Sequence, residues 1–146
     1  MKLYLMRHGQ AADVITDPEK GLSIDGKIAI ENLAHRLTEQ NIRFEQVFHS
    51  EKARARQTAE IMTNILSPDV VPSCKAGMKP NDDPYKLLTD INSWREDTLI
   101  ASHLPFIPHL LMLLTGSNQA TNFTPGTIAC LTKTGSKWQL EWITRP

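Results

Sequence analysis

The sequence has few cysteines, and the two it has are not placed for cross-linking or metal binding. In 146 residues there are only Cys74 and Cys130, which stand far apart and form no Cys-x-x-Cys or Cys/His spacing. A disulfide scaffold and a structural zinc site are therefore disfavoured. We expect a protein of a reducing compartment that carries no metal and no cofactor.

An excess of charge of one sign is also missing. The 16 lysines and arginines balance 16 aspartates and glutamates, so the formal net charge is zero with the five histidines neutral. A broad nucleic-acid-binding surface needs an excess of positive charge, and we expect no nucleic-acid partner. Balanced totals still allow several cations to converge on one pocket.

Long hydrophobic runs are absent. The amino-terminal apolar run covers only residues 3–6, which is too short for a signal peptide. The longest apolar stretch, residues 104–114, is interrupted by two prolines and a histidine and falls below the roughly 18 residues of a membrane span. We expect a cytoplasmic protein with no membrane contact, folded as a single domain over residues 1–146.

The sequence does contain alternating strand and helix patterns. The segment 3–6 is apolar on both faces, as in a strand buried within a parallel sheet. Further strands are expected at 46–49 and 98–101, with a weaker one at 70–73. Helical spacing of apolar residues follows four candidate starts, which are Ser23, Ser50, Asp83-Pro84 and the segment Ser102 to Pro105.

The carboxy-terminal part has a different pattern. Residues 127–132 and 137–144, joined by a turn at Thr134-Gly135-Ser136, predict a hairpin. In its second strand Trp138, Leu140 and Trp142 alternate with polar residues, so we expect the two tryptophans to pack on one apolar face. Together these patterns predict an α/β fold: a single three-layer domain with a mostly parallel central sheet, helices on both faces and a C-terminal antiparallel hairpin.

Three of the expected strands end in residues that can carry chemistry. In open α/β sheets, ligand sites form beyond the carboxyl ends of the strands, so these residues can share one crevice. Helices that start after two of these strands would add N-terminal N–H groups that favour an anion. The strand-end residues are Arg7-His8-Gly9, Ser50 with the nearby Arg54, and Ser102-His103. Two arginines, two histidines and a helix end predict a phosphate pocket.

With these residues the chain resembles the histidine phosphatase superfamily, whose Arg-His-Gly signature follows the first strand. Its length and its Ser-His-Leu-Pro motif are most similar to the SixA-type phosphohistidine phosphatases, which implies a phosphoglycerate mutase-like fold. One departure is Glu51, which stands where the family usually has proline. The other matching segments follow in family order and are Leu22 to Gly26, Ser50 to Thr58, Ser102 to Pro105 and Phe123 to Ala129.

The resemblance implies a role for each site residue. His8 would be the nucleophile, neutral and held through one ring nitrogen while the other attacks phosphorus. Arg7 and Arg54 would keep it neutral and bind phosphoryl oxygens, and His103 would donate to the charge that develops in transfer. No metal is required in this scheme. The expected phosphate-binding residues are Arg7, Arg54, His103, Gly9 and Leu104.

The leaving group separates the possible substrates. An alkoxide benefits from a general acid, whereas the imidazole released from phosphohistidine leaves far more easily. In the segment 78–84 Asp83 is explained as a helix cap, so Asp82 is the remaining candidate acid. The short chain also has little room for a lid over the site. An open site suits phosphohistidine on another protein.

Three functions follow from these observations. The leading one is a phosphatase that acts on the phosphohistidine of a histidine phosphotransfer domain in a signalling relay. The second is a phosphatase of small phosphate esters that uses Asp82 as its acid, and the third is a module that binds a phosphorylated partner without turnover. Of the neighbouring residues, we expect Ser50 to cap its helix and His49 to be structural. No exposed apolar stripe requires a dimer, so we expect a monomer.

Overall fold

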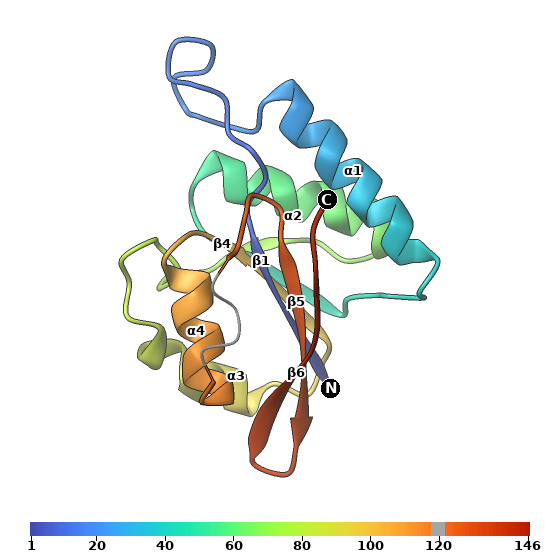
Figure 1. Cartoon of the computed structure of the whole chain (residues 1–146), viewed down its shortest axis with the longest axis vertical. Coiled ribbons are helices and arrows are strands. Elements are labelled where there is room, and N and C mark those ends of the chain that lie inside the picture. Colours follow the sequence, from blue (N-terminus) through green and yellow to red (C-terminus); the bar gives the residue numbers. More distant parts are fainter. Residues whose placement is uncertain (118–121) are drawn as a thin grey trace.

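Six strands form one sheet in the centre of the molecule, and helices cover both of its faces (Figure 1). The computed structural model describes residues 1–117 and 122–146. In chain order the elements are β1 (Lys2–Arg7), α1 (Ile24–Thr38), β2 (Gln46–His49), α2 (Ala53–Leu66), β3 (Ser73–Cys74), the 3-10 helix η1 (Pro84–Leu87), α3 (Leu88–Ser93), β4 (Thr98–Ser102), α4 (Phe106–Thr115), β5 (Ile128–Thr134) and β6 (Lys137–Thr144).

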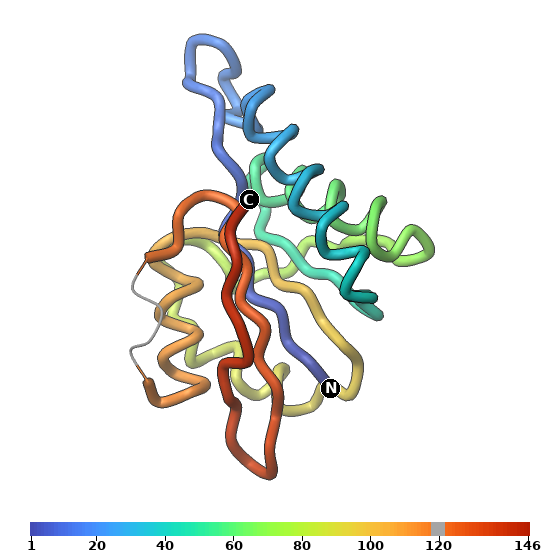
Figure 2. The backbone as a smooth tube through the Cα atoms, turned by 45° about the vertical axis from the view of Figure 1, so that its right-hand side comes forward, coloured from blue at the N-terminus to red at the C-terminus, as the bar shows by residue number. Residues whose placement is uncertain are grey.

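The strand order across the sheet is β3-β2-β4-β1-β5-β6. Strands β3, β2, β4 and β1 run parallel, while β5 pairs antiparallel with both β1 and β6. The predicted α/β fold with a mostly parallel sheet and a C-terminal antiparallel hairpin is therefore confirmed. Figure 2 shows that the tip of this hairpin lies at the end of the sheet opposite the loop that follows β1.

Strand β1 contributes apolar side chains to two separate cores. Because side chains alternate along a strand, Tyr4 and Met6 pack with α1 and α2 on one face, and Leu3 and Leu5 pack with α3 and α4 on the other. All four side chains are buried. The sequence expectation of a strand apolar on both faces is confirmed, and the doubly covered sheet explains it.

The helices begin at the predicted caps in two cases. The Ser23 hydroxyl accepts a hydrogen bond from the Gly26 amide at the start of α1, and the Asp83 carboxylate accepts one from the Tyr85 amide at the start of η1. Each bond satisfies an N–H group that has no partner within its helix. Each helix among the described residues is too short or too polar to cross a membrane.

The structure corrects the expected third strand. Pairing with β2 involves only Ser73 and Cys74, and not the residues from Val70. Pro72 has no N–H to donate, so the ladder begins after it. The strand is a short and exposed edge of the sheet.

The structure also corrects the placement of the tryptophans in β6. Trp138 packs in the core with α3 and α4, whereas Trp142 packs against the opposite core beside Tyr4. The cause is a bulge opposite Cys130 and Leu131, where the register passes from Trp142 to Leu140. One extra residue at a bulge moves the following side chain to the other face, so the two tryptophans do not share one.

Gly26 joins the start of α1 to the loop after β1. A Cβ atom at this position would lie 2.2 Å from the backbone oxygen of Gln10. That oxygen also accepts a hydrogen bond from the Ser23 amide at 2.9 Å, so it has little freedom to move. The glycine is required here because the loop backbone lies directly against the helix.

We predict that Gly26→Ala destabilises the protein even though alanine is the better helix former. An exposed helical glycine gains about 1 kcal/mol on this substitution, whereas here the clash lowers the free energy of unfolding by about 1–3 kcal/mol. Urea unfolding measures the change, with Lys27→Ala on the exposed side of the same turn as the control. A gain in stability for Gly26→Ala would contradict the close packing.

Candidate active site

The carboxyl ends of β1, β2 and β4 bring the predicted site residues together. The backbone N–H of His8 donates to the Ser102 oxygen at 2.9 Å, and that of Ser50 donates to the Ala101 oxygen at 3.2 Å. The imidazole rings of His8 and His103 meet edge to face, with centroids 5.1 Å apart. Parallel pairing of strands that lie far apart in the sequence therefore brings His8, Ser50 and His103 together, as expected.

The ring of His8 has a defined orientation and tautomer. Its Nδ1 lies 2.7 Å from the backbone oxygen of Gly9. A carbonyl oxygen can only accept, so Nδ1 carries the proton of the neutral ring. The other nitrogen, Nε2, then has a free electron pair. This is the arrangement that a nucleophilic histidine needs.

Burial keeps His8 neutral. Loss of solvent is the largest cause that lowers the pKa of His8 from its ordinary value of 6.5 to about 4. The hydrogen bond to Gly9 acts in the opposite direction, and the positive charges of Arg54, Arg7 and Lys20 lower the pKa further. The arginines do help to keep the ring neutral, as expected, but their effect on the pKa is smaller than that of burial.

His103 is buried beside His8 and is also neutral. Burial is the largest cause that lowers its pKa to about 3, followed by repulsion from His8 once that ring is protonated and by the charge of Arg54. Its Nε2 lies 2.5 Å from the Ser50 hydroxyl. Its Nδ1 is buried and has no hydrogen-bond partner among the described residues. A buried ring nitrogen without a partner is costly, so Nδ1 of His103 is a candidate to bond a ligand.

Arg7 and Arg54 belong to different elements, β1 and α2. Arg7 ends β1 and donates from Nη1 to the Phe123 oxygen at 2.9 Å, while its Nε is buried and unpartnered within the described part of the chain. Arg54 lies in the first turn of α2, half-buried, and its charge acts on both His8 and His103. The two guanidinium groups thus add fixed positive charge next to neutral imidazoles.

Ser50 does not cap its helix as expected. The N-cap of α2 is Lys52, which makes no side-chain capping bond, and the Lys52 amide lies 3.4 Å from the Ser50 hydroxyl. Ser50 is buried and makes its short contact with His103 instead. Its neighbour His49 is also buried and donates from Nδ1 to the Ser50 oxygen at 2.8 Å.

Gly9 and Leu104, both predicted to bind phosphate, lie in different settings. The amide of Gly9 donates to the Thr58 hydroxyl at 3.0 Å, so it is already used within the protein. A Cβ atom on Gly9 would meet Ile30 at 2.9 Å, which explains the need for glycine. Leu104 is 38% exposed next to His103, and its contact with a ligand stays a prediction.

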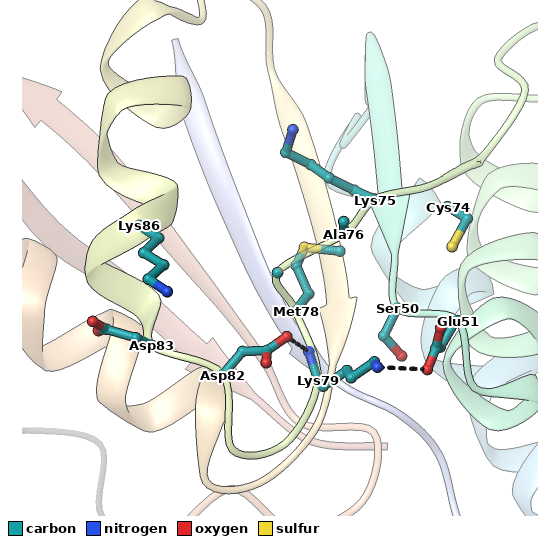
Figure 3. A pocket seen from close by; sticks show the side chains of 11 residues that line it. Ser50, Glu51, Cys74, Lys75, Ala76, Met78, Lys79, Asp82, Asp83 and Lys86 are labelled. Atoms are coloured by element: carbon teal, nitrogen blue, oxygen red, sulfur yellow. Dashed lines mark hydrogen bonds and ion pairs between the residues drawn. The ribbon is translucent and has the colours of Figure 1, made fainter.

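Asp82 lines a pocket of about 390 Å³, and Ser50 is part of the same lining. Its carboxylate accepts a hydrogen bond from the Lys79 amide at 2.9 Å, and the Lys79 ammonium pairs with Glu51 at 3.2 Å (Figure 3). Among the described residues, no hydrogen bond or ion pair connects Asp82 to His8 or His103. The candidate acid is thus engaged as the cap of a turn, and a role in protonating a leaving group stays a prediction.

Sequence reasoning missed several residues that shape the site. Thr58 bonds the loop of Gly9, and Phe123 holds Arg7. Lys20 and Lys52 add positive charge near His8 and His103, respectively. Thr58 and Phe123 had a signal in the sequence, because Thr58 ends the matching segment that begins at Ser50 and Phe123 begins the matching segment that ends at Ala129.

Comparison with known proteins agrees with this geometry. The family model of the histidine phosphatase superfamily (branch 1) matches residues 3–73. An uncharacterised protein of Picosynechococcus sp. is 34% identical over 98 residues, which are 64% of this chain and 58% of the relative. The structure of the protein histidine phosphatase SixA with tungstate has a TM-score of 0.86 at 26% identity and covers 99% of this chain and 97% of that one. The phosphoserine phosphatase of Entamoeba histolytica shares the fold, with a TM-score of 0.78 at 15% identity over 99% of this chain and 97% of that one.

We predict that acid destabilises the protein through the buried histidines. On acidification below pH 6.5 the unfolded chain takes up protons at His8 and His103, whereas the folded protein does not until about pH 4 and pH 3. The free energy of unfolding should therefore fall by up to about 1.4 kcal/mol per pH unit for each histidine. Urea unfolding between pH 7.5 and 5 measures the slope.

His8→Asn tests this assignment, because the asparagine amide can donate to the Gly9 oxygen but does not titrate. We expect a shallower pH dependence than in the wild type. His35→Gln, at an exposed position of α1, should keep the wild-type slope. Equal slopes for His8→Asn and the wild type would contradict a neutral buried His8.

Proposed function

The chain belongs to the histidine phosphatase superfamily and resembles its SixA-type members, and from this premise we propose that it is a phosphatase working through a phosphorylated His8. The observation that carries the proposal is the state of His8, which is neutral with its Nδ1 proton donated to Gly9. Its Nε2 is unprotonated next to two arginines and a second neutral histidine. No metal is needed, because the arginines neutralise the phosphoryl oxygens.

The first step transfers the phosphoryl group to His8. The electron pair of Nε2 forms a bond to phosphorus while the bond from phosphorus to the leaving nitrogen breaks. That nitrogen keeps the electron pair and takes a proton from water. Arg7 and Arg54 bind the phosphoryl oxygens, and the buried Nδ1 of His103 is the donor for the charge that spreads over them.

The second step releases phosphate. A water oxygen bonds to phosphorus, the bond to Nε2 breaks, and the electron pair returns to the His8 ring. The water proton passes to solvent. The proton stays on Nδ1, hydrogen-bonded to the Gly9 oxygen, through both steps. His8 is therefore ready for another cycle as soon as phosphate leaves.

The proposed substrate is phosphohistidine on a protein, in the form of a histidine phosphotransfer domain of a signalling relay. The departing imidazole is a good leaving group and needs no strong general acid. Asp82, the candidate acid, is bonded to the Lys79 amide instead. The similar SixA protein is itself a protein histidine phosphatase, and we extend that substrate class to this chain.

A second candidate is the hydrolysis of small phosphate esters, since Asp82 does line a pocket next to Ser50. For that reaction Asp82 would have to leave Lys79 and protonate the departing oxygen. A binding module without turnover is the third alternative. The neutral, oriented His8 argues against it, because binding of phosphate alone has no need for an unprotonated ring nitrogen.

We predict that His8 becomes phosphorylated during turnover. After mixing with a phosphorylated histidine phosphotransfer domain and quenching in alkali, mass spectrometry should find phosphate on His8. His8→Ala should reduce turnover by more than about 10³-fold and abolish the label. His109→Ala, at an exposed position of α4, is the control and should behave as the wild type. Turnover by His8→Ala at the parent rate would exclude the mechanism.

We also predict that Asp82→Asn leaves phosphohistidine turnover unchanged, because its amide oxygen can still accept from Lys79. A general-acid role would instead cost about 10²–10⁴-fold on esters with poor leaving groups. Steady-state rates on both substrate types decide between the two candidates. Asp83→Asn, which caps η1 beside the same pocket, controls for loss of charge there.

A further inference from the structure

We propose that Thr58 is a positioning residue that orients His8 through the backbone of Gly9. The inference rests on the proposed function in one respect, namely that His8 is the nucleophile. Thr58 lies in α2, is fully buried and touches neither arginine side chain through a hydrogen bond among the described residues. Its effect on the reaction would therefore pass through the loop and not through the phosphate.

Three hydrogen bonds connect α2, the backbone of Gly9 and the His8 ring. The Thr58 hydroxyl donates to the Arg54 oxygen at 2.7 Å, which is one turn earlier in the helix. Because the hydroxyl proton is used in that bond, the Thr58 hydroxyl oxygen is free to accept a hydrogen bond from the Gly9 amide at 3.0 Å. The Gly9 oxygen in turn accepts the Nδ1 proton of His8. The Gly9 amide and the Gly9 oxygen belong to two successive peptide groups, which are joined at the Gly9 Cα.

The peptide group between His8 and Gly9 is held on both sides. Its N–H donates to Thr58, and its oxygen, that of His8, accepts from the Gly126 amide at 3.0 Å. This double hold matters because glycine has wide backbone freedom and a larger residue would collide with Ile30. Thr58 therefore helps to fix the peptide group that precedes the Gly9 Cα, which limits how far the following peptide, with the Gly9 oxygen that bonds the ring, can turn.

Thr63 makes the same hydrogen bond within α2 as Thr58, so that bond does not distinguish Thr58 from another buried threonine. It lies five residues later in the same helix, is also buried, and donates to the Ala59 oxygen at 2.6 Å. Among the described residues its hydroxyl makes no second hydrogen bond. The two threonines thus share helix, burial and backbone contact, and differ in the bond to Gly9. Thr63 is a matched control.

The experiment compares Thr58→Val, Thr58→Ser and Thr63→Val by single-turnover kinetics and by ¹⁵N NMR of the histidine rings. Thr58→Val leaves the Gly9 amide without its partner. We expect the phosphorylation rate of His8 to fall about 10–100-fold with little change in KM, and the Nδ1-protonated form of His8 to lose population. Thr58→Ser should restore most of the rate, and Thr63→Val should leave both readouts as in the wild type.

Several outcomes would overturn the inference. Equal rate losses in Thr58→Val and Thr63→Val would reduce Thr58 to a packing role, as would a slower rate with an unchanged His8 tautomer. If Thr58→Val does not fold, the wild-type NMR spectrum still tests the inference. A His8 ring that is protonated on Nε2 would contradict the hydrogen bond from Nδ1 to Gly9, on which the inference depends. If the wild type has no phosphatase activity, the proposed function fails, while the NMR comparison still tests the positioning of His8.

Discussion

The parallel pairing of β1 and β2 on either side of β4 is the constraint on which the site depends. It places three strand ends, more than 40 residues apart along the chain, at one edge of the sheet. Two backbone hydrogen bonds beyond the strands then join His8 to Ser102 and Ser50 to Ala101. If this pairing shifted by one residue, every one of these side chains would turn to the other face.

The electrostatics of the site follow from that burial. A chain with a formal net charge of zero has no general attraction for anions, yet two arginines and two lysines act on a pair of buried imidazoles. Burial and positive charge both favour the neutral form of a histidine. The cations help to keep His8 unprotonated, and in the proposed reaction they would also bind the phosphoryl oxygens.

The segment between β3 and η1 bears on the substrate. It forms one wall of the pocket next to Ser50, where Glu51 and Lys79 form an ion pair and Asp82 caps the turn. Glu51 stands where the sequence departs from the pattern of the family it resembles, and its pairing with Lys79 keeps its negative charge from acting alone near the proposed phosphate site. This wall holds its acids in structural contacts, which fits a substrate whose leaving group needs little help.

Local sequence patterns were sufficient for the order of strands and helices, for the caps at Ser23 and Asp83, and for the placement of His8, Arg7, Arg54 and His103 at one end of the sheet. These features depend on periodicity, on capping chemistry and on the rule that parallel strands end together. The bulge that sends Trp142 to the other core, the turn of Ser50 toward His103 and the ring nitrogen of His8 that keeps its proton were beyond such patterns. The first two depend on partners elsewhere in the chain, and the third depends on how the loop turns the oxygen of the neighbouring Gly9 toward the ring. The free energy of a buried polar group is set by the atom it meets in the folded chain.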